Sequence, residues 1–464
     1  MYATPQDNER IGHLTQGLDR VGLTDAQSCL VLPIDICDTI FEFAPKPTLL
    51  ACSCVSRAWR EAARPHLFRA LKILRDGPGS YDDFLQFLDE NADIARYIRD
   101  LTLGYAAPPY PETSKNFVPV DTRPVVRRRF LVTLVEKLPR LEELRLSGIL
   151  LDGPDPSHTA VTLPLATSTS EGARCTAPAI ADGSKLGSFR LKWFLIVDCR
   201  SVGSNACYIP TLVDILSAVP ADTVQMRDVY ISFSLRHSLG QIKSIPEGQL
   251  DVCALFMDAN PFRAERQIRY LYDALRRAFA PRCLRRLRLD YMDRTSNSGL
   301  RSLGEIIRRA GGDALRDLEL PFVIDGPVGL SEDTQEHWSV LHLDECRNLE
   351  ALKISLRLDK HGPVPRVPYS AVCNAILAHI SPTLRRLTIT LLLVYGDEQI
   401  GCSQTVCLGA LDDVLEGRFP GLEVVQLEMQ VREAMLPECM KEALEVMPKI
   451  KARGILKVTQ WRFV

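Results

Sequence analysis

The side chains in this sequence that come closest to a metal site lie within one span of ten residues. His337, His342, Asp344 and Cys346 carry the nitrogen, oxygen and sulfur atoms that zinc accepts as ligands. Their spacing matches none of the usual zinc patterns, and the apolar residues between them are typical of ordinary packing. We therefore expect no metal site in this segment.

Motifs that would support catalysis are also missing from the sequence. It contains no Gly-x-x-x-x-Gly-Lys-Ser/Thr phosphate loop, no Gly-x-Gly-x-x-Gly after a strand, and no Gly-x-Ser-x-Gly nucleophile elbow. The basic run 127–129 precedes apolar residues at helical spacing, which indicates a solvated helix face rather than a nucleic-acid site. The sequence thus predicts no catalytic residues and no cofactor, which favours a protein that is not an enzyme.

Composition excludes several broad classes of partner. The 464 residues are 46% hydrophobic and 25% charged, with a formal net charge of −2, so bulk attraction to nucleic acid or to a membrane is not expected. The longest apolar run, near 387–395, is too short to span a bilayer, and the N-terminus has no hydrophobic signal core. Fourteen cysteines without a repeated spacing fit reduced thiols. We expect an intracellular protein of the cytoplasm, the nucleus or both.

The densest apolar stretch, 32–68, reads as three short helices. Pro33 suits the first position of a helix, and Ile36, Ile40 and Phe43 would form an apolar face on it. Thr48 is expected to cap the second helix, and the third is expected to start after residue 56. Of these 37 residues, 20 are hydrophobic, which is more apolar surface than so small a unit can bury. The excess predicts an interaction surface.

The same stretch resembles an F-box. The resemblance rests on Leu32-Pro33, Ile36, Ile40-Phe41 and Leu49-Leu50, and most specifically on the run Cys-Val-Ser-Arg-Ala-Trp-Arg at 54–60. Ile34-Asp35 departs mildly from the two acidic residues that are common there. The resemblance implies docking on a Skp-type adaptor, which links such proteins to a cullin and to ubiquitin transfer. The residues implied in adaptor binding are Leu32, Pro33, Ile36, Ile40, Leu50, Val55 and Trp59.

After a strand expected at 71–74, helix and strand patterns alternate down the chain. Runs of the type Leu-x-x-Leu-x-Leu follow apolar residues at helical spacing, and one such strand is expected at Met226, Val229 and Ile231. Further runs start at Leu284, Leu315, Leu349, Leu384 and Leu422, so successive starts are 31 to 38 residues apart. Strand–helix units at a steady period predict a solenoid.

The pattern resembles leucine-rich repeats, although the units exceed the usual length of about 20–29 residues and lack the terminal Asn or Cys. The combination with an F-box resembles a group of fungal proteins. We expect an α/β fold: a three-helix F-box, then an irregular leucine-rich-repeat-like solenoid with parallel strands and outer helices. An unrelated α/β domain with a parallel sheet is the alternative.

The expected domain limits follow from these patterns. A flexible arm at 1–28 precedes the F-box at 29–75, and the repeat-like domain occupies 76–464. Its segment 152–185 is rich in Pro, Gly, Ser, Thr and Ala and poor in large apolar residues. Such a segment cannot offset its ordering entropy by burial, so we expect a flexible surface insertion there.

Residues between the inward leucines would alternate onto the concave face of the sheet. Basic, acidic and aromatic side chains recur there, and arginine and aromatic residues often anchor interfaces. The residues expected to bind a protein substrate are Arg145, Trp193, Arg286, Arg288, Asp290, Asp317, Glu319, Lys353 and Arg386.

These features favour a substrate-recognition subunit of an adaptor–cullin–F-box ubiquitin ligase, whose partners are a Skp-type adaptor, a cullin and an unknown protein client. Two alternatives stay open. One is an F-box scaffold that binds the adaptor without a role in ubiquitination. The other is a hydrolase or transferase on a repeat scaffold.

Overall fold

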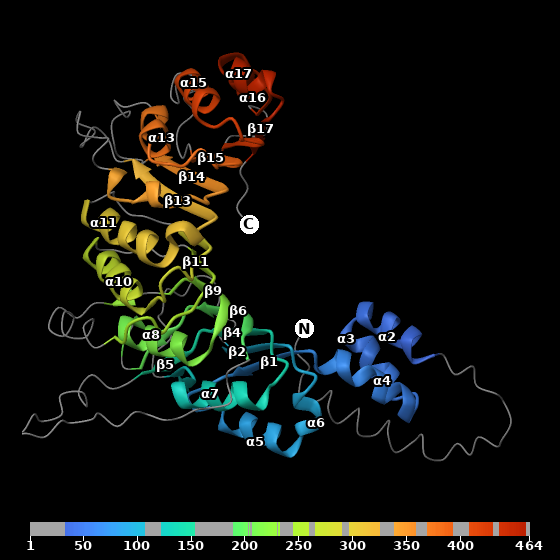
Figure 1. Cartoon of the computed structure of the whole chain (residues 1–464). Coiled ribbons are helices and arrows are strands. Elements are labelled where there is room, and N and C mark those ends of the chain that lie inside the picture. The colour runs from blue at the N-terminus through green and yellow to red at the C-terminus, as the bar shows by residue number, and fades with distance from the viewer. Residues whose placement is uncertain are drawn as a thin grey trace, which may run out of the picture. The chain divides into compact units, whose positions relative to one another are not determined.

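The chain divides into two compact units, Met1–Leu67 and Phe68–Val464, which we call the helical unit and the sheet unit (Figure 1). The computed structural model describes residues 33–106, 122–153, 189–202, 204, 207–229, 231–232, 245–258, 265–289, 297–324, 338–358, 369–392, 408–429 and 436–460. The expected arm at 1–28 and most of the expected insertion, from 154 to 185, lie outside these residues.

The helical unit consists of α2 (Ile34–Phe43), α3 (Lys46–Ser53) and α4 (Arg57–Phe68). Pro33 precedes α2, and its carbonyl accepts hydrogen bonds from the N–H groups of Ile36 and Cys37 at 3.0 and 3.1 Å. The cap expected at Thr48 is wrong, because α3 already begins at Lys46. Its first turn includes a proline, whose missing N–H that turn does not use.

The sheet unit, as far as the structure describes it, is built on a sheet of twelve parallel strands that follow one another in chain order. Its neighbouring pairs all run parallel, as the alternation of strands and helices predicted. The strands, in sheet order, are β1 (Ala70–Arg75), β2 (Asp100–Tyr105), β4 (Glu143–Ser147), β6 (Leu191–Val197), β9 (Ala221–Arg227), β11 (Ala254–Asp258), β12 (Arg286–Leu289), β13 (Asp317–Ile324), β14 (Ala351–Leu358), β15 (Arg386–Leu392), β16 (Val424–Met429) and β17 (Leu456–Gln460).

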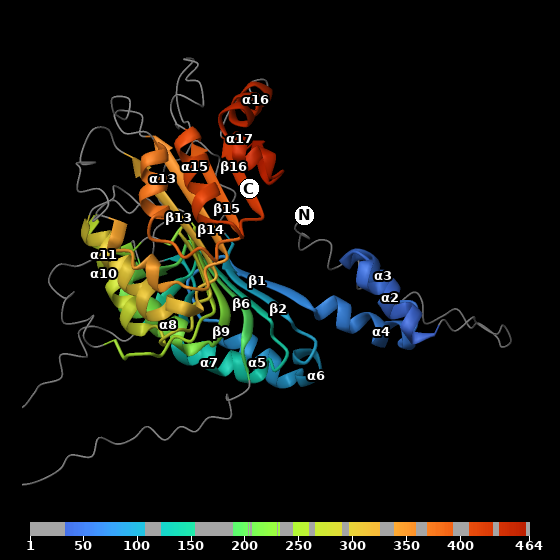
Figure 2. The same cartoon turned by 45° about the horizontal axis from the view of Figure 1, so that its top comes forward.

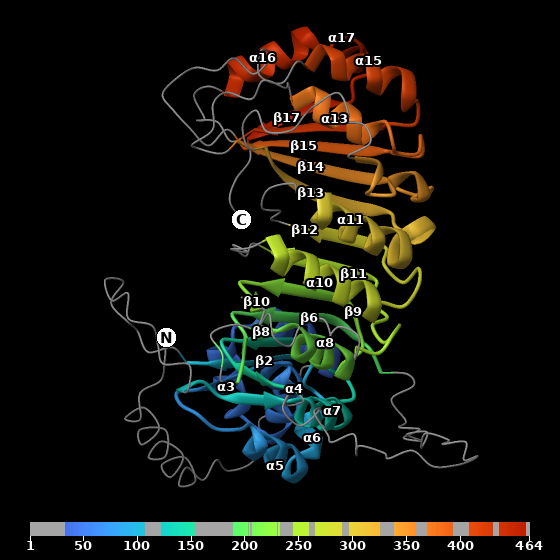
Figure 3. The same ribbon diagram turned by 90° about the vertical axis from the view of Figure 1, so that its left-hand side faces the viewer.

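Helices connect these strands and cover one face of the sheet (Figures 1 and 2). In Figure 3 the helices α10, α11 and α13 lie in front of the strands, which are stacked side by side behind them. The helices are α5 (Asp82–Glu90), α6 (Ala92–Ala95), α7 (Arg128–Lys137), α8 (Ile209–Ala218), α10 (Glu265–Ala278), α11 (Asn297–Ile306), α13 (Tyr369–Leu377), α15 (Leu408–Arg418), α16 (Leu436–Val446) and α17 (Pro448–Ala452). A π-helical turn, Ile307–Gly311, extends α11, and 3₁₀ turns lie at Gly312–Ala314 and Leu343–Glu345.

Two small sheets accompany the large one: β3 (Val125–Arg127), β5 (Leu150–Asp152) and β7 (Arg200–Ser201) form the first, and β8 (Cys207–Tyr208) and β10 (Ile231–Ser232) form the second. None of the described helices is both long and apolar enough to cross a membrane.

The core lies between the sheet and its helices. Leucines alternate inward along the strands, so that Leu144 and Leu146 on β4, like Leu318 and Leu320 on β13, are fully buried. Register places core residues beside core residues, for example Leu318 beside Leu352. Because side chains alternate, the same register lines up the intervening residues on the opposite face, which we call the open face.

Several strands differ from the sequence prediction, among them two in the middle of the large sheet. The strand expected at Met226, Val229 and Ile231 is wrong, because the sheet strand is β9 (Ala221–Arg227) and Ile231 belongs to β10. The chain leaves the sheet at Asp228, whose φ of 52° is left-handed. The strand β11 was not anticipated, because Ala254 and Leu255 are both buried, which breaks the spacing used to find the other strands.

Candidate protein-interaction surfaces

The helical unit has a small core of its own. Five side chains are buried in it: Cys37, Phe41, Leu49, Ala62 and Ala63. Trp59, half-buried on α4, packs edge-on against Phe41 with ring centroids 5.6 Å apart. Ser56 caps α4, since its hydroxyl oxygen accepts the N–H of Trp59 at 3.2 Å. The core thus uses only part of the apolar surface of these helices.

The remaining apolar side chains of this unit face solvent. Five of the eight large exposed hydrophobic residues in the described part of the chain lie here: Ile36, Ile40, Phe43, Leu50 and Val55. Their exposed fractions run from 48% for Ile36 to 81% for Phe43. Burying each such side chain against a partner would contribute up to about 1.5–3 kcal/mol. A partner surface is the physical reason to keep them exposed.

Residues 29–73 match the F-box-like family. This match covers the three helices and the first part of β1, and it confirms the F-box that the sequence predicted. F-box-like domains typically bind Skp-type adaptors. No curated protein matches the chain.

The F-box-like domain displays most of the residues that were expected to contact the adaptor. Pro33, Ile36, Ile40, Leu50 and Val55 are exposed. Trp59 instead supports the surface from within by packing on Phe41, and Leu32 lies outside the described residues.

Phe43 was missing from that expected set although it is the most exposed of the large apolar residues. Its seven-residue spacing from Ile36 already indicated a shared helix face. The sequence pattern did not separate this face from the neighbouring face of Cys37 and Phe41, which turns into the core.

In the sheet unit, the residues expected to bind a client fall on the open face. Trp193 and Arg286 share one row across the strands. Arg145, Arg288, Glu319 and Lys353 share the next row. Asp317 and Arg386 extend the first of these rows, and Asp290 lies outside the described residues. That they bind a client stays a prediction.

Ion pairs join part of this set into a chain toward the C-terminal strands. Arg288 pairs with Glu319 at 3.3 Å, and Lys353 lies 3.1 Å from Glu319 and 3.2 Å from Glu428. Burial alone would lower the pKa of Lys353, but the two carboxylates outweigh it and raise the pKa above its ordinary value. Thr390 donates a further hydrogen bond to Glu428 at 2.8 Å. These charges therefore already satisfy one another.

The open face is more apolar in its first half, which is the half formed by the N-terminal strands of the sheet. Trp193 on β6 and Phe256 on β11 lie with their rings 5.9 Å apart and tilted by 34°. Leu195 and Val197, both half-buried, continue the patch along β6. A hollow of about 380 Å³ opens beside Trp193, and its walls are Asp100, Leu101, Thr102, Glu143, Leu144, Arg145, Trp193, Leu195 and Gln225. Burial raises the pKa of Asp100 in this wall.

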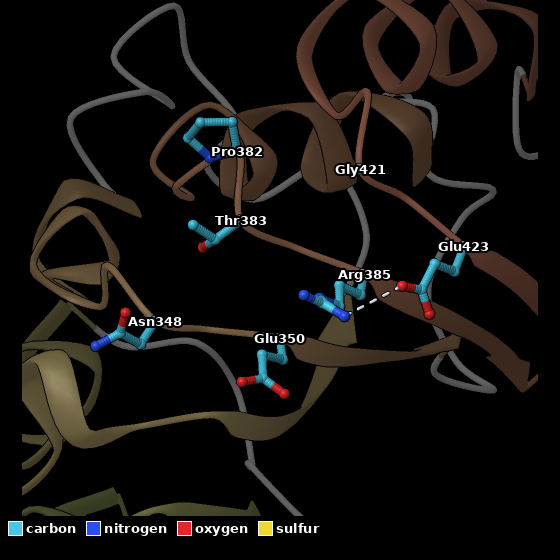
Figure 4. A pocket seen from close by; sticks show the side chains of 7 residues that line it. All are labelled: Asn348, Glu350, Pro382, Thr383, Arg385, Gly421 and Glu423. Atoms are coloured by element: carbon cyan, nitrogen blue, oxygen red, sulfur yellow. Dashed lines mark hydrogen bonds and ion pairs between the residues drawn. The ribbon is translucent and has the colours of Figure 1, made fainter.

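A second hollow, of about 470 Å³, lies where β14, β15 and β16 begin (Figure 4). The charged side chains in its wall already form ion pairs: Arg385 lies 3.3 Å from Glu423, and Glu350 pairs with Arg316. Thr383 donates to the carbonyl of Arg347 at 2.9 Å. The polar groups of this hollow therefore hold adjacent strands together and offer little to a ligand.

The sequence also singled out candidate metal ligands at 337–346. His342 lies 3.7 Å from Glu305 and 3.6 Å from Glu345, Asp344 is exposed, and Cys346 is buried. His337 lies outside the described residues. Among the residues that the structure does describe, no three His, Cys, Asp or Glu side chains are grouped as a metal site would require.

Proposed function

We propose that this chain is the substrate-recognition subunit of an adaptor–cullin–F-box ubiquitin ligase. The F-box-like domain would bind a Skp-type adaptor, and the open face of the sheet unit, as an irregular leucine-rich-repeat-like solenoid, would hold a protein client. The chain itself would carry out no chemistry. It would contribute proximity, by holding the client where a separate enzyme transfers ubiquitin.

One observation carries this proposal: the segment that matches the F-box-like family also holds five of the eight large exposed hydrophobic residues in the described part of the chain. An exposed residue can be changed without removing core contacts, so adaptor binding and folding are separable. The sheet unit, whose parallel strands are rich in leucine, has a core of its own and supplies a broad second surface.

The test is a pull-down of a Skp-type adaptor with the full-length chain. Ile40→Asp should abolish capture, because it places a charge in the apolar contact. Met440→Asp is the matched control, since this residue is also an exposed hydrophobe, but it lies on α16 of the sheet unit. Capture of the adaptor by Ile40→Asp at wild-type levels would overturn the adaptor assignment.

Ligase function needs a second measurement. A cullin should co-purify with the wild-type chain and be lost with Ile40→Asp. Clients trapped under proteasome inhibition should accumulate when the chain is removed. An adaptor complex without cullin, and with no client whose abundance changes, would instead identify a scaffold without a role in ubiquitination.

A further inference from the structure

The first half of the open face carries an apolar centre with a basic residue on either side. The centre consists of Trp193 and Leu195 on β6 and Phe256 on β11, all half-buried. Arg145 on β4 lies next to Leu195 in register, and Arg288 on β12 lies next to Phe256. Arg286, two residues before Arg288, is exposed on the same strand.

Two of these arginines, Arg145 and Arg286, are available to a partner, unlike the charged residues on the C-terminal strands of the open face. Arg145 and Arg286 form no ion pair with any other residue in the described part of the chain, and both are exposed. Arg288, Glu319 and Lys353 are instead committed to one another. Unpaired positive charge therefore lies at both ends of the apolar centre.

The spacing of the strands gives the distance between Arg145 on β4 and Arg286 on β12. From β4 to β12 the sheet passes through β6, β9 and β11, which makes four steps of about 4.8 Å, or about 19 Å. An extended peptide advances about 3.3 Å per residue, so about six residues cover this distance. The hollow beside Trp193 provides room for one large side chain of such a peptide.

We propose that the open face between β4 and β12 binds an extended client segment in which a large apolar side chain lies between two acidic residues spaced about six positions apart. The apolar side chain enters the hollow against Trp193, and the acidic residues pair with Arg145 and Arg286. Asp100 and Glu143 continue the row of Trp193 beyond β6, and their carboxylates offer acceptors to the segment's backbone N–H groups.

This inference rests on the proposed function, since it names the class of segment that such a receptor would recognise. The probes are fluorescein-labelled synthetic peptides of ten residues, titrated against the purified full-length chain and followed by fluorescence anisotropy. One series varies the spacing of two aspartates from three to nine positions around a central Leu or Trp. The comparison peptides carry Lys in place of Asp, or Ala in place of the central residue.

Peptides with aspartates about six positions apart should bind at least about tenfold more tightly than either comparison series. Arg145→Glu and Arg286→Glu should each weaken binding about tenfold, and Trp193→Ala about thirtyfold, the loss typical of an interface anchor. Arg386→Glu is the matched control, because Arg386 is an exposed arginine of the same face outside the site. Far-UV circular dichroism should be unchanged in all four variants.

A charge swap makes the test sharper. A peptide with Lys at one acidic position should regain affinity for Arg145→Glu or for Arg286→Glu but not for the wild type. Equal binding of Asp and Lys peptides, an equal loss with Arg386→Glu, or no binding of any peptide would overturn the inference. The adaptor pull-down is independent of these peptides, so the ligase proposal stands if only the peptide experiment fails.

Discussion

At the residue scale, one helix of the F-box-like domain supplies both a core and a surface. Phe41 is buried at 2% exposure, whereas Ile40, its neighbour in sequence, is 52% exposed. Both are large and apolar, so hydrophobicity alone does not distinguish their roles. The difference is that Phe41 has Trp59 to pack against within the unit.

This division predicts different outcomes for two truncations. Trp59→Ala should cost about 2–3 kcal/mol of local stability, less than the loss of about 3–5 kcal/mol for a fully buried Trp. Ile40→Ala should change stability by less than about 0.5 kcal/mol yet still weaken adaptor capture. Native-state hydrogen exchange of residues 34–67 measures the first effect and the pull-down the second. Equal stability losses in both variants would contradict the division.

Cysteine reactivity provides a second test at this scale. Burial raises the pKa of the Cys199, Cys207 and Cys373 thiols to about 12, whereas Cys54 is exposed on the F-box-like domain. Near pH 8 only about one in ten thousand of the buried thiols would be the reactive thiolate. Iodoacetamide should therefore modify Cys54 before these three buried cysteines, which should react only after denaturation, as read by peptide mass spectrometry. Early labelling of Cys199 would indicate local opening.

At the scale of elements, the C-terminal helices depend on one buried carboxylate. Asp412 on α15 is 2% exposed, and its two oxygens accept the N–H groups of Lys449 and Ile450 at 2.9 Å each. These N–H groups lie in the first turn of α17, a helix of five residues that begins at Pro448. Without this carboxylate, both donors would lose these partners.

Asp412→Ala should therefore destabilise this end of the sheet by about 3 kcal/mol, because two hydrogen bonds to a charged group are lost. The neighbouring residue Asp413 is the control. Among the described residues its exposed carboxylate pairs with the side chain of Lys449, so Asp413→Ala should cost much less than Asp412→Ala. Urea unfolding and hydrogen exchange of residues 436–460 measure the difference. Comparable costs would show that the buried cap is not what holds α17.

At the scale of the whole molecule, the two units have separate cores. The buried residues of the helical unit form one small cluster, and those from Tyr81 onward form another. A unit with five buried core residues falls below the size at which hydrophobic burial offsets chain entropy. The sheet unit, with twelve paired strands, does not share this limit.

Dividing the chain between residues 67 and 68 should therefore yield unequal fragments. Residues 68–464 should unfold cooperatively and retain peptide binding but lose adaptor capture. Residues 29–67 alone should show little helix by far-UV circular dichroism and gain it when a Skp-type adaptor is added. A stable helical fragment without adaptor would contradict the argument from core size.

Sequence by itself determined the features that local pattern encodes. The F-box signature at 54–60 follows from residue identity, and strands such as β4, β13 and β14 follow from alternating leucines, because each pattern acts over a few neighbouring residues. Only the tertiary structure decided which apolar face of α2 is covered, where β9 and β11 join the sheet, and which charges on the open face are already paired. These outcomes depend on residues from distant segments, such as Trp59 above Phe41 and Glu428 beside Lys353, whose approach is set by packing and register rather than by spacing in the chain.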